Sequence, residues 1–263
     1  MTHAPHVRGY GWLPQTPDLR DQQFARQLPQ LPPEADLRAH MPPVYDQGQL
    51  GSCTANAIGG AMEYVRTRQG ESDFMPSRLF IYYNERVVEG TTSSDSGAQI
   101  RDGIKVVNTE GVCPESSWPY DITKFTVRPT PDCYTSALTD LVLQYQAVQT
   151  LADLKDALSS SLAVVFGFTV YESFESQQVA SSGIVPLPQP NERAVGGHAV
   201  LAVGYSDPKG QLTVRNSWGS GWGDQGYFYM PYEYLTGPGK VADTSVVNGG
   251  YLASDFWAVQ KTA

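Results

Sequence analysis

Residues 47–65 read QGQLGSCTANAIGGAMEYV, a glycine-rich turn that leads into Cys53 and then into a helical pattern. Apolar residues follow the cysteine with the i, i+3, i+4, i+7 spacing of a helix that buries one face, namely Ile58, Ala61, Met62 and Val65. Cys53 therefore stands at a predicted helix N-terminus, where partial positive charge and free N–H groups favour a thiolate over a thiol. A lone cysteine is more often a small buried apolar residue, so this stretch alone does not establish a reactive thiol.

The other predicted elements fall into two groups along the chain. Helices are expected at 77–89, at 98–110 and after Thr150, which resembles the start of a capping box with Asp153. Strands are expected at 161–170, 194–206, 211–217 and 226–230, with a turn at 207–210. Because helices come first and strands second, without alternation, the order favours an α+β fold in two lobes over repeated βαβ units.

Two later motifs carry polar side chains that could serve a reactive cysteine. Residues 196–200, GGHAV, place His198 in an apolar strand behind two glycines. Residues 216–223, NSWGSGWG, place Asn216 before a glycine-rich turn with two tryptophans. Taken singly, the histidine is more often a satisfied core residue, and the asparagine a turn former.

Together these motifs resemble the papain family of cysteine peptidases. Gly51-Ser52-Cys53 matches the core of that family's C-G-[SA]-C-[WY] signature, and His198 follows Cys53 by 145 residues, within the family's interval of about 130–150. Asn216 follows by 163 residues, slightly beyond the interval. Gln47, six residues before Cys53, stands where the family keeps its oxyanion-hole glutamine, and Asn-Ser-Trp-Gly is itself characteristic of the family.

The resemblance implies an α+β, papain-like two-lobe fold with the active-site cleft between the lobes. We expect a helical lobe at about 47–130 and a β-barrel-like lobe at about 131–263 together with 34–46. It also implies a mechanism in which Cys53 and His198 form a thiolate–imidazolium pair and the thiolate attacks the peptide carbonyl. Asn216 would orient the imidazole, with Trp218 covering their hydrogen bond, and Gln47 would stabilise the oxyanion.

Substrate binding is expected to use two loops of the family fold. Residues 95–98 resemble the glycine-bearing loop whose backbone pairs with the substrate as an added strand, which makes Ser96 and Gly97 candidate contacts. Val195 and Gly197, just before the histidine, are candidates for the pocket of the second substrate residue, and Trp218 is a further candidate. Pocket specificity, and the choice between endo- and exopeptidase action, remain open.

The chain also departs from the family pattern. Leu50 stands where the signature has a cysteine and Thr54 where it has an aromatic residue, so the disulfide beside the active site must be absent. The two cysteines left after the nucleophile, Cys113 and Cys133, are expected to lie close enough for a disulfide. The short stretch before the catalytic region resembles a bacterial branch of the family with a short N-terminal pro-segment.

Residues 1–33 predict an extended arm, because they are polar and rich in proline and lack a helical or strand period. We expect Tyr10, Trp12 and Phe24 to anchor this arm over the substrate cleft, where it would inhibit the enzyme. The alternative is an arm packed on the outer face of one lobe.

Composition narrows the possible partners. The formal net charge is −9 and the pI about 4.9, without a basic patch, which argues against nucleic acid and anionic membranes. No apolar run approaches the roughly 18 residues of a membrane span. The first residues, MTHAPH, show no signal peptide, so we expect a cytoplasmic protein or export by a non-standard route. Scattered cysteines and histidines predict no metal or cofactor, and we expect a monomer.

Two alternative functions remain open from the sequence. The same triad supports acyl transfer to an amine or amide deamidation, because those reactions differ only in what attacks the acyl-enzyme. A catalytically silent peptide-binding relative would keep the fold, although such relatives usually lose the cysteine or the histidine.

Overall fold

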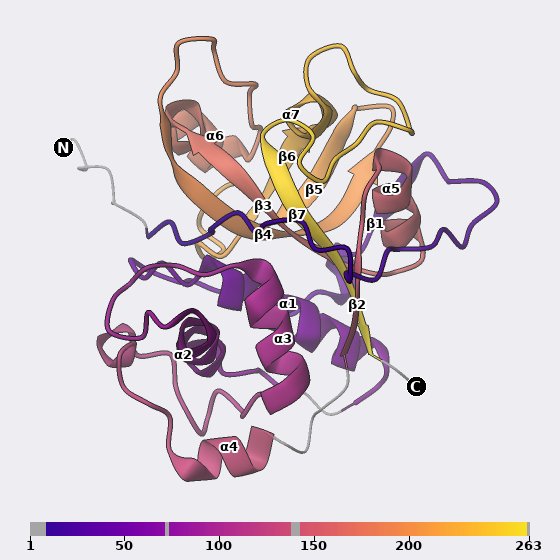
Figure 1. Ribbon diagram of the computed structural model, residues 1–263. Coiled ribbons are helices and arrows are strands. Elements are labelled where there is room, and N and C mark those ends of the chain that lie inside the picture. The colour runs from indigo at the N-terminus through magenta and orange to yellow at the C-terminus, as the bar shows by residue number, and fades with distance from the viewer. Residues whose placement is uncertain (1–8, 72–73, 138–142, 262–263) are drawn as a thin grey trace.

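The computed structural model describes residues 9–71, 74–137 and 143–261, and it divides into a helical group and a sheet (Figure 1). The helical group consists of α1 (Cys53–Arg68), α2 (Arg78–Glu89), α3 (Ile100–Glu110) and α4 (Pro131–Ala137). Tyr134 of α4 donates a hydrogen bond to Asn84 of α2 over 2.9 Å, so α4 packs with the helices.

Seven strands form one antiparallel sheet beside these helices. They are β1 (Glu34–Asp36), β2 (Leu143–Ala147), β3 (Val164–Tyr171), β4 (Ala194–Ser206), β5 (Gln211–Arg215), β6 (Tyr227–Pro231) and β7 (Ala253–Lys261). The sheet order is β2-β7-β3-β4-β5-β6, with β1 paired to β4. Along the described chain the path starts at β2 and ends at β6, so the sheet is open, and barrel-like describes it only loosely. The papain-like α+β fold is confirmed.

The short helices α5 (Leu151–Ser159), α6 (Gln177–Ser182) and α7 (Tyr232–Thr236) lie with the sheet (Figure 1). The capping box that opens α5 is confirmed: Asp153 N–H donates to Thr150 Oγ1 over 3.2 Å, and Thr150 N–H donates to Asp153 Oδ2 over 3.0 Å. These reciprocal bonds satisfy two of the backbone donors that a helix start leaves free.

Helix α1 lies at the junction of the two groups. Its residues from Cys53 to Val65 are all buried, because it packs against α2 and α3 on one side and against β4 and β7 on the other. At Gly60, on the side that faces the sheet, a Cβ would lie 3.4 Å from the Arg215 side chain, an ordinary contact distance. The interface between the two groups therefore fixes the N-terminus of α1, where the cysteine stands.

Cys113 and Cys133 lie side by side in the helical group, and both are free thiols. Burial raises the pKa of the Cys113 thiol to about 12, and the neighbouring Cys133 adds to this shift. The predicted proximity is confirmed, but the structure contains no bond between them.

Candidate active site

Cys53 is the first residue of α1 and has no exposed surface. Burial raises the pKa of its thiol to about 12, while the backbone N–H groups of Ala199 and Gly11 act in the opposite direction. In this arm-covered state, burial therefore disfavours the charged form of the thiol. Gly11, whose backbone N–H reaches the sulfur, belongs to the N-terminal arm, so the arm contributes to this burial.

His198 and Asn216 are brought together by the pairing of β4 with β5, which aligns Leu201 with Arg215. His198 Nε2 lies 2.8 Å from Asn216 Oδ1, and both residues are buried. Because an amide oxygen can only accept, Nε2 carries the proton in this pair. The Trp218 indole stacks on the His198 ring with 4.9 Å between centroids, and Trp218 is 4% exposed. The indole thus shields the hydrogen bond from water, which strengthens it.

Gln47 is held beside the cysteine loop by both ends of its amide. Ser217 Oγ donates to Gln47 Oε1 over 2.6 Å, and Gln47 Nε2 donates to the Leu50 carbonyl over 2.9 Å. Nε2 also donates to the carbonyl of Gly9, an arm residue, over 3.0 Å. The amide N–H expected to bind an oxyanion is therefore directed at an arm carbonyl.

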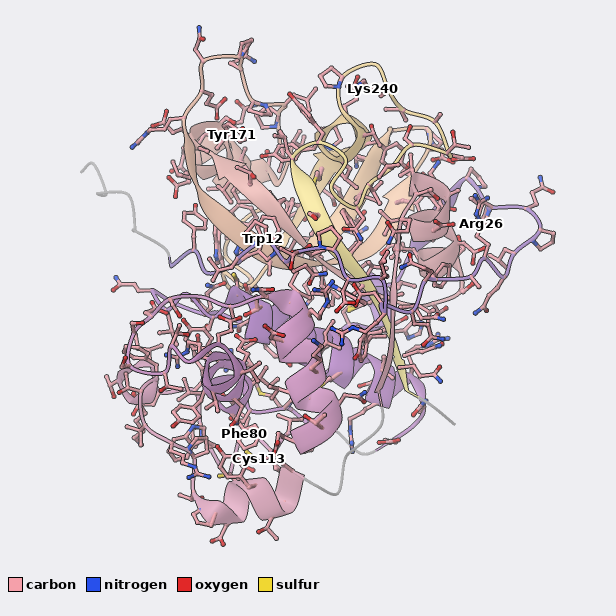
Figure 2. The ribbon with its side chains drawn as sticks, in the orientation of Figure 1. Trp12, Arg26, Phe80, Cys113, Tyr171 and Lys240 are labelled. Carbon is pink, nitrogen blue, oxygen red and sulfur yellow. The ribbon has the colours of Figure 1, made fainter. Side chains whose placement is uncertain are left out.

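The arm runs through the cleft between the two lobes, where Trp12 is visible in Figure 2. Its backbone bonds to both sides: Trp12 N–H donates to the Gly197 carbonyl over 3.0 Å, and Ala98 N–H donates to the Gly11 carbonyl over 2.7 Å. The Tyr10 ring lies 6.0 Å from the His198 ring, and Tyr10 Oη donates to Glu175 over 2.5 Å. The predicted docking over the cleft is confirmed, and the alternative of an outer-face arm is wrong.

Further along, the arm is fixed by contacts at a distance from Cys53. Phe24 is buried, and its N–H donates to the Ala147 carbonyl over 2.9 Å. Arg101 of α3 forms an ion pair with Asp21 and donates to the Thr16 carbonyl over 2.8 Å. All three expected aromatic anchors therefore contact the catalytic body.

The candidate substrate-binding residues lie along the same path. Gly97 has a φ of 73°, and a Cβ there would lie 2.1 Å from the Gly11 carbonyl oxygen, so only glycine admits the arm this closely. Ser96 instead directs its hydroxyl at Thr91 Oγ1 over 2.8 Å, and the partly buried Val195 packs against the core. Ala98, which the sequence reasoning did not single out, makes the backbone pairing.

Hydrogen bonds join the cysteine loop to the substrate loop in place of the missing disulfide. The N–H of Gly51 donates to both carboxylate oxygens of Asp95, over 3.1 and 3.0 Å. Tyr82 donates its hydroxyl to the same carboxylate and accepts from Gly97 N–H over 3.2 Å. One carboxylate thus ties the cysteine loop to the substrate loop.

The described residues were compared with the requirements of a membrane-spanning helix and of a metal site. Within the described ranges, no helix is long and apolar enough to cross a membrane. In the same part of the chain, histidine, cysteine and acidic side chains do not gather in groups that could hold a metal ion.

Comparison with known proteins gives concordant matches. A family model described as papain family cysteine protease matches residues 31–242. A peptidase C1-like protein of Acanthamoeba polyphaga mimivirus is 47% identical over 226 residues, which cover 82% of this chain and 69% of that protein. A cathepsin L-like peptidase of Aedes aegypti is 29% identical over 198 residues, covering 72% of this chain and 55% of its own length.

Among solved structures, xylellain, a cysteine protease from Xylella fastidiosa, superposes with a TM-score of 0.86 and 40% identity, and each chain is fully covered. A procathepsin B from Trypanosoma congolense superposes with a TM-score of 0.70 over 100% of this chain and 90% of its own. At 17% identity, the second likeness shows the fold alone.

Proposed function

Because the chain belongs to the papain family of cysteine proteases, we propose that it hydrolyses peptide bonds through Cys53, His198, Asn216 and Gln47, and that its own N-terminal arm blocks this activity. The chain is thus a hydrolase of the thiol-protease class. The assignment of residues rests above all on one observation: Asn216 binds Nε2 of His198 under a stacked tryptophan. This leaves Nδ1 of the imidazole to exchange a proton with the cysteine.

Catalysis starts when the arm leaves and water reaches Cys53. The helix N-terminus and the adjacent imidazolium then lower the pKa of the thiol, so that the proton passes from Sγ to His198. The thiolate attacks the peptide carbonyl, and the imidazolium gives its proton to the leaving amine, which forms an acyl-enzyme. Water, deprotonated by the same imidazole, then releases the acid. Asn216 holds the ring in place throughout.

The oxyanion of each tetrahedral intermediate is stabilised by Gln47 Nε2 and by the backbone N–H of Cys53. Gln47 is suited to this role because Ser217 fixes its carbonyl end and the Leu50 carbonyl fixes Nε2, which leaves one N–H for the oxyanion. Removal of one such donor typically lowers turnover about 10²–10³-fold. In the arm-covered state the Gly9 carbonyl accepts a hydrogen bond from this amide.

The arm blocks catalysis without being a substrate, because of its direction. A substrate has its reacting carbonyl at Cys53 and its preceding residues along 96–98. The arm runs the other way: Gly9 is at Gln47, Gly11 at Cys53, and Trp12 then pairs in parallel with Ala98. The peptide bonds of the arm therefore meet Cys53 in the opposite chain direction to those of a substrate. The arm thus occupies the site without being cleaved there.

The test compares the purified full chain with the same protein after protease cleavage of the arm near Pro32-Pro33. Cleavage should raise hydrolysis of a fluorogenic peptide library, and a thiol-directed epoxide should label Cys53 but not the buried Cys113. The Cys53→Ala variant should keep the fold and lose all hydrolysis. Residual activity in this variant would refute the assigned nucleophile, and full activity of the uncleaved chain would refute inhibition by the arm.

A further inference from the structure

The indole of Trp12 fills a pocket whose base is the carboxyl group of Asp255. Trp12 is 6% exposed and Asp255 is 2% exposed, and Trp12 Nε1 donates to Asp255 Oδ2 over 3.0 Å. Two glycines line the pocket: a Cβ at Gly167 would lie 2.0 Å from the indole, and one at Gly197 would lie 2.8 Å from it. The pocket therefore has room for a large side chain because Gly167 and Gly197 have no side chains of their own.

Asp255 faces this pocket because the backbone of β7 is irregular there. The pairing of β3 with β7 shifts register between Val165 and Gly167, and Asp255 has a φ of 60°, which is left-handed for a residue with a side chain. Its N–H is held by Asn248 Oδ1 over 2.8 Å. Bulges near active sites redirect side chains, and strained backbone persists where the surrounding structure over-determines it. The fold thus holds a carboxyl group in a buried pocket.

The donors that reach the inner oxygen of Asp255 come from the arm. Oδ2 accepts from Trp12 Nε1 and from the backbone N–H of Gln15, each over 3.0 Å, whereas Oδ1 accepts from the neighbouring Ser254. Burial raises the pKa of Asp255, and these N–H groups act against that shift. When the arm leaves, Oδ2 loses both arm donors, which must be replaced by water or by a group that enters the pocket. A side chain that enters the pocket with an N–H group restores the lost bond.

Building on the proposed function, we infer that this pocket receives the second substrate residue and that Asp255 makes it select arginine, lysine or tryptophan over apolar side chains. The position follows from the backbone, since Trp12 pairs with Ala98 and Gly197, the two walls along which the residues before the cleaved bond lie. Tryptophan would donate its indole N–H to the carboxylate, as Trp12 of the arm does. Arginine adds a charge and a planar set of donors that match a carboxylate.

Arg101 is the competing partner for Asp255. It contributes a favourable charge to the Asp255 carboxylate, and in the closed state it is bonded to Asp21 and the Thr16 carbonyl of the arm. Release of the arm frees both groups. If Arg101 then paired with Asp255, the pocket would lose its preference for basic side chains, and arginine would not be preferred to leucine as the second substrate residue.

The first experiment uses the full-length Trp12→Ala chain and peptides that differ only in the second residue, arginine against leucine. The ratio of the two kcat/KM values does not depend on the fraction of molecules whose arm is open. Since a hydrogen bond to a charged group corresponds to about a tenfold or larger effect, arginine should be preferred by at least about tenfold. Adding Asp255→Asn should remove this preference, whereas Asp132→Asn, the same change at an exposed residue of α4, should retain it. A preference for leucine, or a ratio that Asp255→Asn leaves unchanged, overturns the inference.

The second experiment needs no catalysis, so it separates a failure of this inference from a failure of the proposed function. In full-length Trp12→Arg and Trp12→Leu chains, hydrogen exchange is measured at the amide of Leu13, which donates to the Ala98 carbonyl over 3.0 Å. The amide should exchange about tenfold more slowly with arginine than with leucine, and Asp255→Asn should abolish the difference. Equal protection in the presence of Asp255 refutes selection by the carboxylate. Loss of hydrolysis in every chain, with this difference intact, refutes only peptide cleavage.

Discussion

Gly167→Ala in the full-length chain should release the arm without any change to the arm itself. The added Cβ would lie 2.0 Å from Trp12 Cε2 and 2.3 Å from Cδ2 and Nε1, distances that no pair of non-bonded atoms tolerates. The obstacle is a rigid ring wedged between Gly167 and Gly197, so the indole must leave the pocket. Gly167 has no left-handed φ, and alanine fits the strand backbone of β3 there.

The size of the effect follows from what Trp12 loses. Removal of a buried tryptophan side chain typically costs about 3–5 kcal/mol. Taking the lower end, because the ring can find partial cover elsewhere, a loss of about 3 kcal/mol lowers the docking equilibrium of the arm by roughly 150-fold. Hydrolysis by the intact chain should rise by the same factor, or until every molecule is open.

The assay must avoid the pocket that the substitution narrows. A fluorogenic peptide with alanine or glycine as its second residue is therefore used, and the rate of Cys53 alkylation is measured in parallel. Gly221→Ala is the matched control, since a Cβ at Gly221 meets no atom within 4 Å. If the Gly167→Ala chain hydrolyses and alkylates no faster than the control, although both reach the same rate after arm cleavage, Trp12 is not what holds the arm.

Three further predictions concern the catalytic residues and the fold. Asn216→Ala should lower kcat less than His198→Ala, because Asn216 orients the ring and transfers no proton; equal losses in two folded variants would contradict this. Alkylation of Cys53 in the intact chain should stay slow at neutral pH and accelerate as the pH rises towards about 12, because burial raises the pKa of the thiol and the closed state disfavours the thiolate up to that value. After arm cleavage the same reaction should already be fast near pH 7, and identical profiles would show that the arm does not set the pKa. Thr150→Ala removes one half of the capping box of α5 and should lower the free energy of unfolding by about 1 kcal/mol in a denaturant titration, with peptide hydrolysis unchanged.

The proposed catalytic residues could be selected from the sequence because each lies in a local motif. Cys53 at a helix start, His198 behind two glycines and Asn216 before a tryptophan are recognisable without knowledge of their neighbours. The capping box of α5 was equally predictable, since Thr150 bonds a residue only three positions along the chain. Features that depend only on a short stretch of sequence could therefore be predicted.

The rest depends on contacts between distant segments. Strand β7 was not predicted, and Asp255 within it faces the Trp12 pocket only because the pairing with β3 shifts register. The complete burial of Cys53 was also not foreseen, because the arm residue Gly11, which contacts it, lies 42 positions earlier in the chain. Neither signal is present in any short stretch of sequence.

The hydrogen-bonded tie between the cysteine loop and the substrate loop makes the cleft independent of redox conditions. The tie consists of hydrogen bonds from Gly51 and Tyr82 to the carboxylate of Asp95. All three cysteines of the chain are free thiols. A thiol protease must meet enough reductant to keep its nucleophile from oxidising, and here that reductant finds no covalent crosslink to break. A reductant that keeps the Cys53 sulfur reduced would therefore leave this tie intact.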